Sequence, residues 1–114
     1  MLASYKEAFM FLPGTHRELT AHFNALANPT RLRILESLAE SGEESVNQLA
    51  LDLRVSQPRI SWHLRLLRLG GLVRTRRDGR QVYCSLDPDA IGRRHLELSR
   101  MLGLLPARTE TGVN

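Results

Sequence analysis

Hydrophobic residues recur at helical spacing along most of the chain, most clearly over residues 56–69. One apolar stripe follows this stretch at intervals of four and three residues, formed by Ile60, Leu64 and Leu67. Ser56 is of a type that caps helices, and Pro58 falls in the first turn, where a missing N–H costs little. The pattern predicts a helix whose outer side carries Pro58, Ser61, Trp62, Arg65 and Leu69.

Two further helices are predicted before this one. Residues 15–27 open with the capping-box spacing of Thr15 and Glu18, and their apolar positions are Leu19, Phe23, Leu26 and Ala27. Asn28-Pro29 ends that helix and begins another, because proline disfavours helical geometry just before it yet is accepted at a first helical position. The second helix ends at Ser41-Gly42, and its expected buried face is Leu32, Leu35, Leu38 and Ala39.

A short third helix is predicted just before residue 56. Ser45 and Gln48 have capping-box spacing, and the apolar positions that follow are Leu49, Ala50 and Leu53. Arg54-Val55 leaves only a tight connection to the next helix, so the two helices match a helix-turn-helix. Gly70-Gly71 closes the second of them, as glycine commonly does.

The region after residue 71 alternates in the manner of β-strands. Residues 72–76 and 81–86 flank Arg77-Asp78-Gly79-Arg80, and Asp-Gly between two such runs is a strong hairpin signal. A basic hairpin directly after a helix-turn-helix predicts the wing of a winged helix, with its tip along a phosphate backbone or in the minor groove. The alternative is a plain edge hairpin that its charge keeps soluble.

A last helix is predicted over residues 88–104, with Asp87 as its cap. Its apolar side consists of Ile91, Leu98, Met101, Leu102 and Leu105. Because this side is too apolar for a lone appendage, we expect the helices at 15–27 and 88–104 to form a homodimer contact, symmetric dimers being the commonest oligomers. The alternative is that both helices fold back on their own subunit.

Charge is distributed unevenly along the 114 residues, whose net charge is +4. Residues 36–53 hold five acidic residues and no basic one, whereas residues 54–80 hold eight arginines and one acidic residue. A polyanionic partner would be attracted strongly to the second block. A solvated basic surface without a partner would give the same pattern.

The predicted helix and wing together fit duplex DNA. Gln57 and Ser61 are expected to hydrogen-bond base edges in the major groove, and Pro58 and Trp62 to make apolar contact there. The residues expected at the phosphates are Ser56, Arg59, Arg65, Arg76, Arg77 and Arg80.

The totals describe one small domain. Its 42% hydrophobic and 25% charged residues are ordinary for a soluble globular protein, and no export signal or membrane-spanning run is present. The single cysteine, Cys84, fits a reducing cytoplasm. We expect a cytoplasmic protein with an N-terminal arm or short helix at 1–14, a winged helix-turn-helix and dimerisation domain at 15–105, and a flexible tail at 106–114.

Three segments of the chain are weak indicators of a protein family singly, but their combination and spacing are specific. They are ALANPTRLRILESL at 25–38, LRVSQPRISWHLRLLRLGGLV at 53–73 and RRDGRQVYCSLD at 76–87. Together they resemble the ArsR-type (ArsR/SmtB) family of bacterial winged helix-turn-helix repressors, over about residues 15–104. The resemblance implies a mostly α fold of about five helices with a two-stranded wing, and a homodimer joined by its N- and C-terminal helices. It also implies a pseudo-palindromic operator that is released when an effector binds.

Metal sensing is common in that family, but two of its metal sites are missing here. The cysteine pair of one site would fall at residues 44–48, which hold no cysteine, and Asp87-Pro88-Asp89 lacks the histidine of the other. If the terminal helices meet across a dimer, the remaining ligand candidates for Ni, Zn or Co as an effector are His16, His22, Asp87 and His95. The alternative is a set of scattered surface or capping histidines.

The sequence leaves two other classes of function to weigh. A winged helix can serve as a protein-interaction module without specific DNA binding, although the block of eight arginines argues against this role. No nucleophile-elbow, phosphate-loop or paired-carboxylate pattern surrounds the serine, histidine and aspartate residues, so we do not expect an enzyme. No membrane partner is expected, and the pattern does not by itself imply a contact with RNA polymerase.

Overall fold

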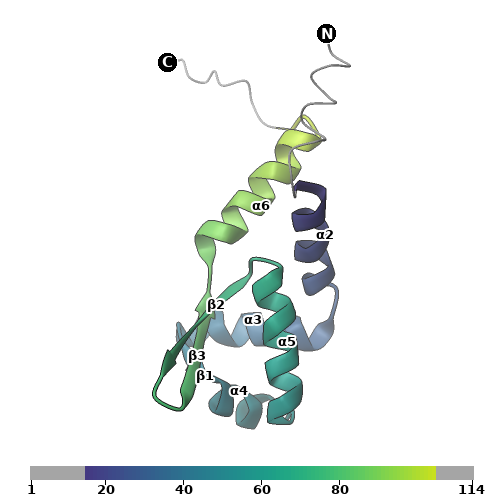
Figure 1. The fold of residues 1–114 in the computed structure, drawn as a ribbon. Coiled ribbons are helices and arrows are strands. Elements are labelled where there is room, and N and C mark those ends of the chain that lie inside the picture. The colour runs from purple at the N-terminus through teal and green to yellow at the C-terminus, as the bar shows by residue number, and fades with distance from the viewer. Residues whose placement is uncertain (1–14, 105–114) are drawn as a thin grey trace.

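The computed structural model describes residues 15–104, which form five helices and a three-stranded antiparallel sheet (Figure 1). The helices are α2 (Thr15–Leu26), α3 (Pro29–Ser41), α4 (Val46–Leu53), α5 (Gln57–Leu69) and α6 (Pro88–Met101). The strands are β1 (Glu44–Ser45), β2 (Val73–Asp78) and β3 (Gln81–Leu86). This order confirms the predicted winged helix-turn-helix fold. The predicted arm at 1–14, the tail at 106–114 and Leu105 lie outside the described residues.

The wing is a hairpin of β2 and β3, and β1 pairs with the other edge of β3. Its register runs from Val73 opposite Leu86 to a turn that consists of Gly79-Arg80 alone. Gly79 supplies the positive φ, 65°, that a two-residue turn requires at its first position. Strand β1 was not predicted, because two residues are too few to show the alternation of a strand.

Side chains cap three of the helices. The side-chain oxygens of Asn28, Ser45 and Asp87 each accept the backbone N–H three residues further on, at 3.1 Å. Only half of the capping box predicted at Ser45 forms, because the Gln48 side-chain amide donates to Asp52 at 2.8 Å instead. Ser56 stands at the N-cap of α5 but makes no side-chain cap bond, so its predicted role as a helix cap was wrong.

The core lies between α3, α4, α5 and the sheet. Its fully buried side chains include Ile34, Leu38, Leu49, Ile60, Leu67, Val73 and Cys84. The predicted stripe of α5 is confirmed, since Ile60, Leu64 and Leu67 are all buried. Each such aliphatic side chain stabilises the fold by about 1.5–3 kcal/mol relative to an exposed one. Burial of this stripe leaves the opposite side of α5 facing solvent.

The buried face of α3 differs from the prediction. Leu32 is 50% exposed, and Ala39 is also exposed, whereas Ile34 and the side chain of Arg31 are buried. The prediction was wrong because it counted only apolar positions. Because Arg31 is buried, the buried face of α3 is displaced by about one position from the face that its apolar residues predict. Hydropathy alone cannot reveal a buried arginine.

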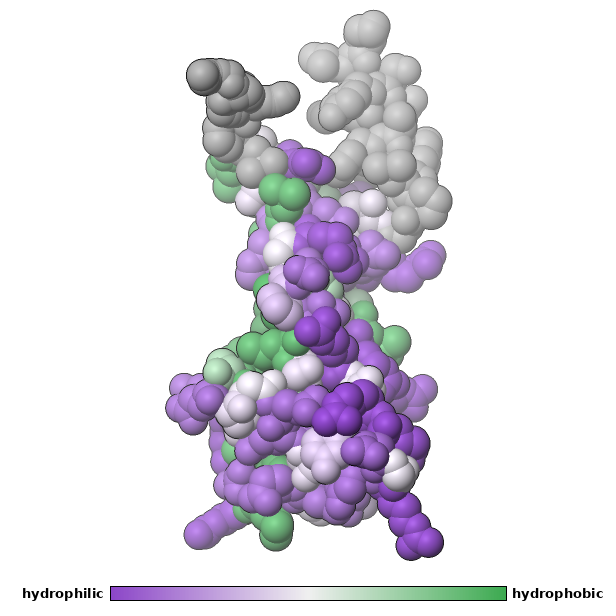
Figure 2. All heavy atoms as spheres, turned by 90° about the vertical axis from the view of Figure 1, so that its left-hand side faces the viewer, coloured by the Kyte–Doolittle hydropathy of each residue, from purple (hydrophilic) through white to green (hydrophobic). Residues whose placement is uncertain are grey.

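Helices α2 and α6 pack together above the rest of the molecule (Figure 1). Large hydrophobic side chains remain exposed here, namely Phe23 of α2, Leu96 of α6, and Leu102 and Leu104 just after α6. Seen from the side of the sheet, hydrophobic residues lie in small groups on a mostly hydrophilic surface (Figure 2). None of the helices within 15–104 is long and apolar enough to span a bilayer.

Candidate nucleic-acid interface

The outer face of α5 is open to solvent along its length. Trp62 is 55% exposed, and the other side chains predicted to meet DNA there are exposed as well, namely Gln57, Pro58, Arg59, Ser61 and Arg65. Ser56 is exposed at the start of the helix, and its hydroxyl makes no cap bond. The structure therefore presents one polar and aromatic face on a helix whose opposite side is fixed in the core.

A hollow of about 210 Å³ separates this face from the wing. Gln57 and Ser61 line it from α5, and Arg80 lines it from the wing turn. Asn47 and Arg68 also line the hollow, and neither was predicted as a site residue. Arg68 could have been found from the sequence, because it lies seven residues after Ser61 and so shares its side of the helix. The hollow brings the predicted base-reading residues next to a wing arginine.

Buried Arg31 anchors α5 to the junction of α2 and α3. Its guanidinium donates to the backbone oxygens of Ala25 at 2.8 Å and Asn24 at 3.2 Å, and contacts His63 Nδ1 at 3.2 Å. Because arginine can only donate, His63 Nδ1 must accept, so the neutral ring carries its proton on Nε2. Burial, followed by the charges of Arg31 and Arg59, lowers the pKa of His63.

Trp62 contacts the same buried arginine, Arg31, on its protein-facing side. The Arg31 guanidinium carbon lies 5.9 Å from the centroid of the Trp62 ring, within the range of a cation–π contact. The ring of His63 meets Trp62 edge to face, with centroids 5.2 Å apart. These contacts hold the exposed indole in place on the outer face of α5.

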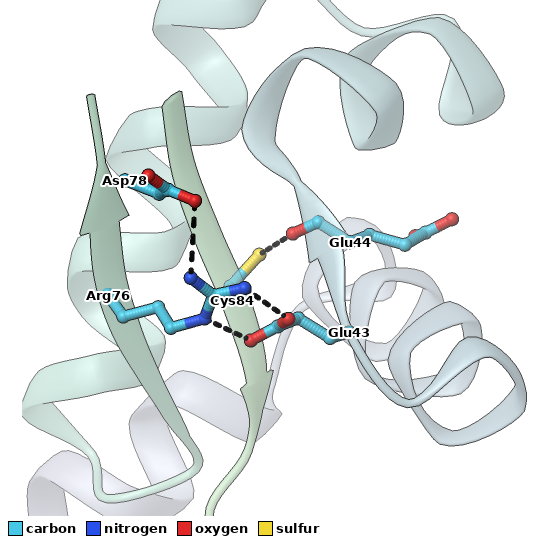
Figure 3. Close-up of polar contacts among 5 residues, drawn as sticks. All are labelled: Glu43, Glu44, Arg76, Asp78 and Cys84. Atoms are coloured by element: carbon cyan, nitrogen blue, oxygen red, sulfur yellow. Dashed lines mark hydrogen bonds and ion pairs between the residues drawn. The ribbon is translucent and has the colours of Figure 1, made fainter. Parts of the chain in front are cut away.

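The arginines of the wing differ in their surroundings. Arg76 donates two hydrogen bonds to the Glu43 carboxylate, at 2.9 and 2.8 Å, and forms a longer ion pair with Asp78 at 3.9 Å (Figure 3). Its guanidinium also lies 4.6 Å from the centroid of the Tyr83 ring on β3. The hydrogen bond from Arg76 lowers the pKa of Glu43. Acidic partners within the protein thus already neutralise Arg76.

The other predicted phosphate-contacting arginines are Arg59, Arg65, Arg77 and Arg80, and all four are exposed. Within residues 15–104, none of these four forms an ion pair with a carboxylate. Their charges remain available to a polyanion, whereas the charge of Arg76 is shared with Glu43.

Exchanging the charges of Glu43 and Arg76 tests whether Arg76 serves the ion pair within the protein or contacts a DNA phosphate. A variant carrying Glu43→Arg together with Arg76→Glu is expected to bind duplex DNA within about twofold of the wild type, because the ion pair that holds the wing is restored. Arg76→Glu alone should weaken binding several-fold, since two carboxylates then face each other. Fluorescence anisotropy would measure both affinities. A double variant as weak as the single one would mean that Arg76 itself meets a phosphate.

Cys84 is not placed for redox chemistry. Its side chain is fully buried on β3, and its thiol donates to the backbone oxygen of Glu44 at 3.3 Å (Figure 3). Burial, with smaller effects of Glu44 and Glu43, raises the pKa of the thiol to about 12. The reactive thiolate is therefore scarce at neutral pH.

Only two of the four candidate metal ligands lie together. The rings of His22 and His95 are in edge contact, with centroids 5.4 Å apart. His16 is exposed near the start of α2, and Asp87 is engaged as the cap of α6. In the part of the chain that the structure describes, no three His, Cys, Asp or Glu side chains are grouped to hold a metal ion.

Comparisons with known proteins agree with this geometry. Residues 28–75 match the profile of the family described as "Bacterial regulatory protein, arsR family". Nodulation protein NolR of Rhizobium meliloti is 45% identical over 75 residues, which cover 65% of this chain and 61% of NolR. The HTH-type transcriptional regulator Rv2034 of Mycobacterium tuberculosis is 38% identical over 87 residues, which cover 76% of this chain and 80% of that regulator.

A solved structure extends the agreement to three dimensions. The homodimeric winged helix-turn-helix DNA-binding domain Mb0332 of Mycobacterium bovis is 31% identical, with a TM-score of 0.62 over 79% of this chain and 83% of that domain. The arsenical resistance operon repressor of Escherichia coli is also similar, at 47% identity over 66 residues, or 58% of this chain and 56% of the repressor. The chain spans between about half and three-fifths of the first curated relatives it matches. Among these relatives, Rv2034 is named a transcriptional regulator and the Escherichia coli protein an operon repressor.

An exposed helix face, a basic wing and a buried anchor behind them define a winged helix-turn-helix domain of the DNA-binding regulator class. The similarities above then give the family. The chain belongs to the arsR family of bacterial regulatory proteins.

Proposed function

We propose that this protein is a sequence-specific DNA-binding transcriptional regulator that represses its target genes as a homodimer. The observation that carries the proposal is the exposed face of α5, where Gln57, Ser61 and Trp62 lie beside arginines that form no ion pair within residues 15–104. A protein-interaction module would not need this concentration of one sign of charge. A repressor of chromosomal genes acts in the cytoplasm, so the proposal places the protein there.

Helix α5 would enter the major groove of each half-site. Gln57 and Ser61 would hydrogen-bond base edges, and Pro58 and Trp62 would make apolar contacts, for instance with thymine methyl groups. Phosphates would be bound by Ser56, Arg59, Arg65, Arg77 and Arg80, with Arg68 added from the hollow beside the wing. In this arrangement α5 reads the sequence, and the wing contributes affinity.

A second copy of the chain would cover the apolar surface of α2 and α6. Leu19, Phe23, Leu98 and Met101 line a shallow hollow of about 520 Å³ between the two helices. A two-fold axis there would place the two copies of α5 on one side of the dimer. They would then reach successive major grooves of a pseudo-palindromic operator, about one helical turn apart.

The effector belongs to the same proposal. Imidazole nitrogens suit Ni²⁺, Zn²⁺ or Co²⁺, and His22 and His95 already lie together, although the remaining ligands would have to come from elsewhere in the dimer. His16 or Asp87 of the partner could complete such a set. Titrating the dimer with Co²⁺ would report binding by its visible absorption and, separately, by a change in operator affinity. The absence of both signals would reject a metal effector.

Two single substitutions distinguish contacts with base edges, which give specificity, from contacts with phosphates, which give affinity for any sequence. Ser61→Ala is expected to narrow the difference in affinity between the preferred duplex and a scrambled one by about 1–3 kcal/mol, because a base-edge contact is lost. Arg77→Ala should weaken binding to both duplexes alike and reduce the slope of log affinity against log salt by about one. Anisotropy titrations at several salt concentrations measure both effects. Equal affinity of the wild type for the two duplexes would defeat the proposed specificity.

A further inference from the structure

A hollow of about 220 Å³ lies between the C-terminal halves of α2 and α5 and the first turn of α3. It is lined by Ala21, Asn24, Ala25, Arg31, Leu66 and Leu69. Its apolar residues take no part in the contacts proposed with DNA or with a second copy of the chain. The hollow is therefore a feature of the fold that the proposed function does not yet use.

The walls of the hollow are apolar. On α5, Leu66 and Leu69 follow Trp62 at intervals of four and three residues, so the three form a second apolar stripe beside the buried one. This second stripe is open to solvent, since Leu69 is 65% exposed. Ala21 and Ala25 face it from α2, and their short side chains leave the space between the two helices unfilled.

Arg31 brings a buried positive charge to the wall of the hollow. The residue is only 8% exposed, and within residues 15–104 it forms no ion pair with a carboxylate. Its hydrogen-bond acceptors are two backbone oxygens and His63 Nδ1, which are all uncharged groups. Because a buried charge is costly without a counter-charge, an anion in the hollow would be stabilised strongly.

The Arg31 guanidinium also has donors left for such an anion. Each of its three nitrogen atoms makes one hydrogen bond within residues 15–104, which accounts for three of its five N–H groups. The other two are one N–H on each terminal nitrogen. Paired N–H groups of a guanidinium match the two oxygens of a carboxylate, so a carboxylate is the anion that fits best.

The volume of the hollow sets the size of the ligand. Pockets for drug-sized molecules measure about 300–1,000 Å³, whereas an apolar cavity of about 150 Å³ accepts benzene. A hollow of about 220 Å³ therefore suits one ring or a short chain together with its carboxylate.

We propose that this hollow is an effector site for a small apolar carboxylate, with the carboxylate on Arg31 and the apolar part between α2 and α5. None of the candidate metal ligands lines the hollow, so the site is separate from any metal site. The bound carboxylate neutralises the guanidinium that lies 5.9 Å from the Trp62 ring, and so weakens the cation–π contact at the outer face of α5. Operator affinity falls as a result, a step that rests on the proposed function.

Binding is tested first without DNA, on the full-length protein, with benzoate as the probe. Benzamide has the same shape and no charge, so benzoate is expected to bind about tenfold or more tightly. NMR titration should shift the Arg31 Nε–H and Trp62 indole signals and leave the exposed Arg33 side chain unchanged. Equal binding of benzoate and benzamide, or shifts confined to exposed arginines, would overturn the site.

A hollow-filling variant tests the location without removing the buried arginine. Ala21→Leu occupies the space between the helices and should weaken benzoate binding about tenfold or more. Ala39→Leu, at an exposed alanine of α3, is the matched control and should bind benzoate as the wild type does. Urea denaturation would confirm that both variants fold, and wild-type benzoate binding by folded Ala21→Leu would contradict the proposal.

A second pair of variants keeps the test independent of packing. Leu69→Glu places a carboxylate at the rim of the hollow on an exposed residue, so it should repel benzoate and leave the fold intact. Leu51→Glu makes the same change at an exposed leucine of α4, outside the hollow, and should bind benzoate normally. Equal benzoate affinity of these two variants would place the site elsewhere.

The effect on DNA is measured last, by anisotropy with the preferred duplex. Saturating sodium benzoate should weaken wild-type binding about fivefold or more relative to sodium chloride at the same concentration, and should not affect Ala21→Leu. Benzoate that binds the protein without changing operator affinity would overturn the effector role. A wild type that shows no preference for its duplex in sodium chloride would instead count against the proposed function alone.

Discussion

Replacing Gly70 with alanine is expected to lower the free energy of unfolding by about 2–3 kcal/mol, because the new methyl group has no room. Its Cβ atom would lie 2.9 Å from the Ala21 oxygen, which belongs to helix backbone and cannot turn aside as a flexible side chain could. The φ of Gly70 is −82°, which alanine adopts freely, so the loss is one of packing and not of backbone strain. Urea denaturation would measure the change.

Gly92 offers a matched control for this substitution. It lies within α6, is exposed, and would place a Cβ atom with nothing within 4 Å. Gly92→Ala should therefore raise the free energy of unfolding by about 0.5–1 kcal/mol, since alanine is the better helix former. A Gly70→Ala variant as stable as the wild type would show that α2 and α5 are not in contact at this point.

Arg31→Met is expected to cost about 2–4 kcal/mol of stability and to loosen α5. Methionine fills a similar volume but leaves the Asn24 and Ala25 oxygens without the donor that now satisfies them. His63 Nδ1 also loses its hydrogen-bond donor, so the contacts that join α5 to the α2–α3 junction through Arg31 are lost. Denaturation would measure the stability, and the emission of Trp62, the only tryptophan, would report the change at the helix.

Arg33→Met serves as the control for Arg31→Met. Arg33 is an exposed arginine on the same helix, and its hydrogen bond to the Leu53 oxygen is also exposed. Its replacement should change stability by no more than about 0.5 kcal/mol. Arg31→Lys should not restore the wild-type stability, because one ammonium group cannot reproduce the fixed fork of a guanidinium. Equal losses of stability in Arg31→Met and Arg33→Met would contradict the claim that Arg31 anchors α5.

Much of the fold could be predicted from the sequence because its signals are local. The stripe of α5, the glycines after it and the hairpin at Gly79 each depend on residues that lie close together in the chain. The exposed face of α5 followed directly from its buried stripe. These patterns sufficed for the fold, and they placed the residues predicted to contact DNA on the solvent-exposed side of α5.

Features that depend on buried polar groups could not be predicted in this way. Hydropathy treats arginine and histidine as surface residues, so Arg31, His22 and His63 were absent from the expected core. Contacts between distant residues were also hidden. Arg76 finds Glu43, 33 residues away, only because β1 pairs with β3, and a strand of two residues leaves no readable pattern.

Selection of bound sequences from a pool of random duplex DNA tests the central claim most directly. If two α5 faces of a dimer read DNA, the full-length protein will enrich an inverted repeat whose half-site centres lie about 10–10.5 base pairs apart. The account would be contradicted by a pool that shows no enrichment, or by a single motif without two-fold symmetry.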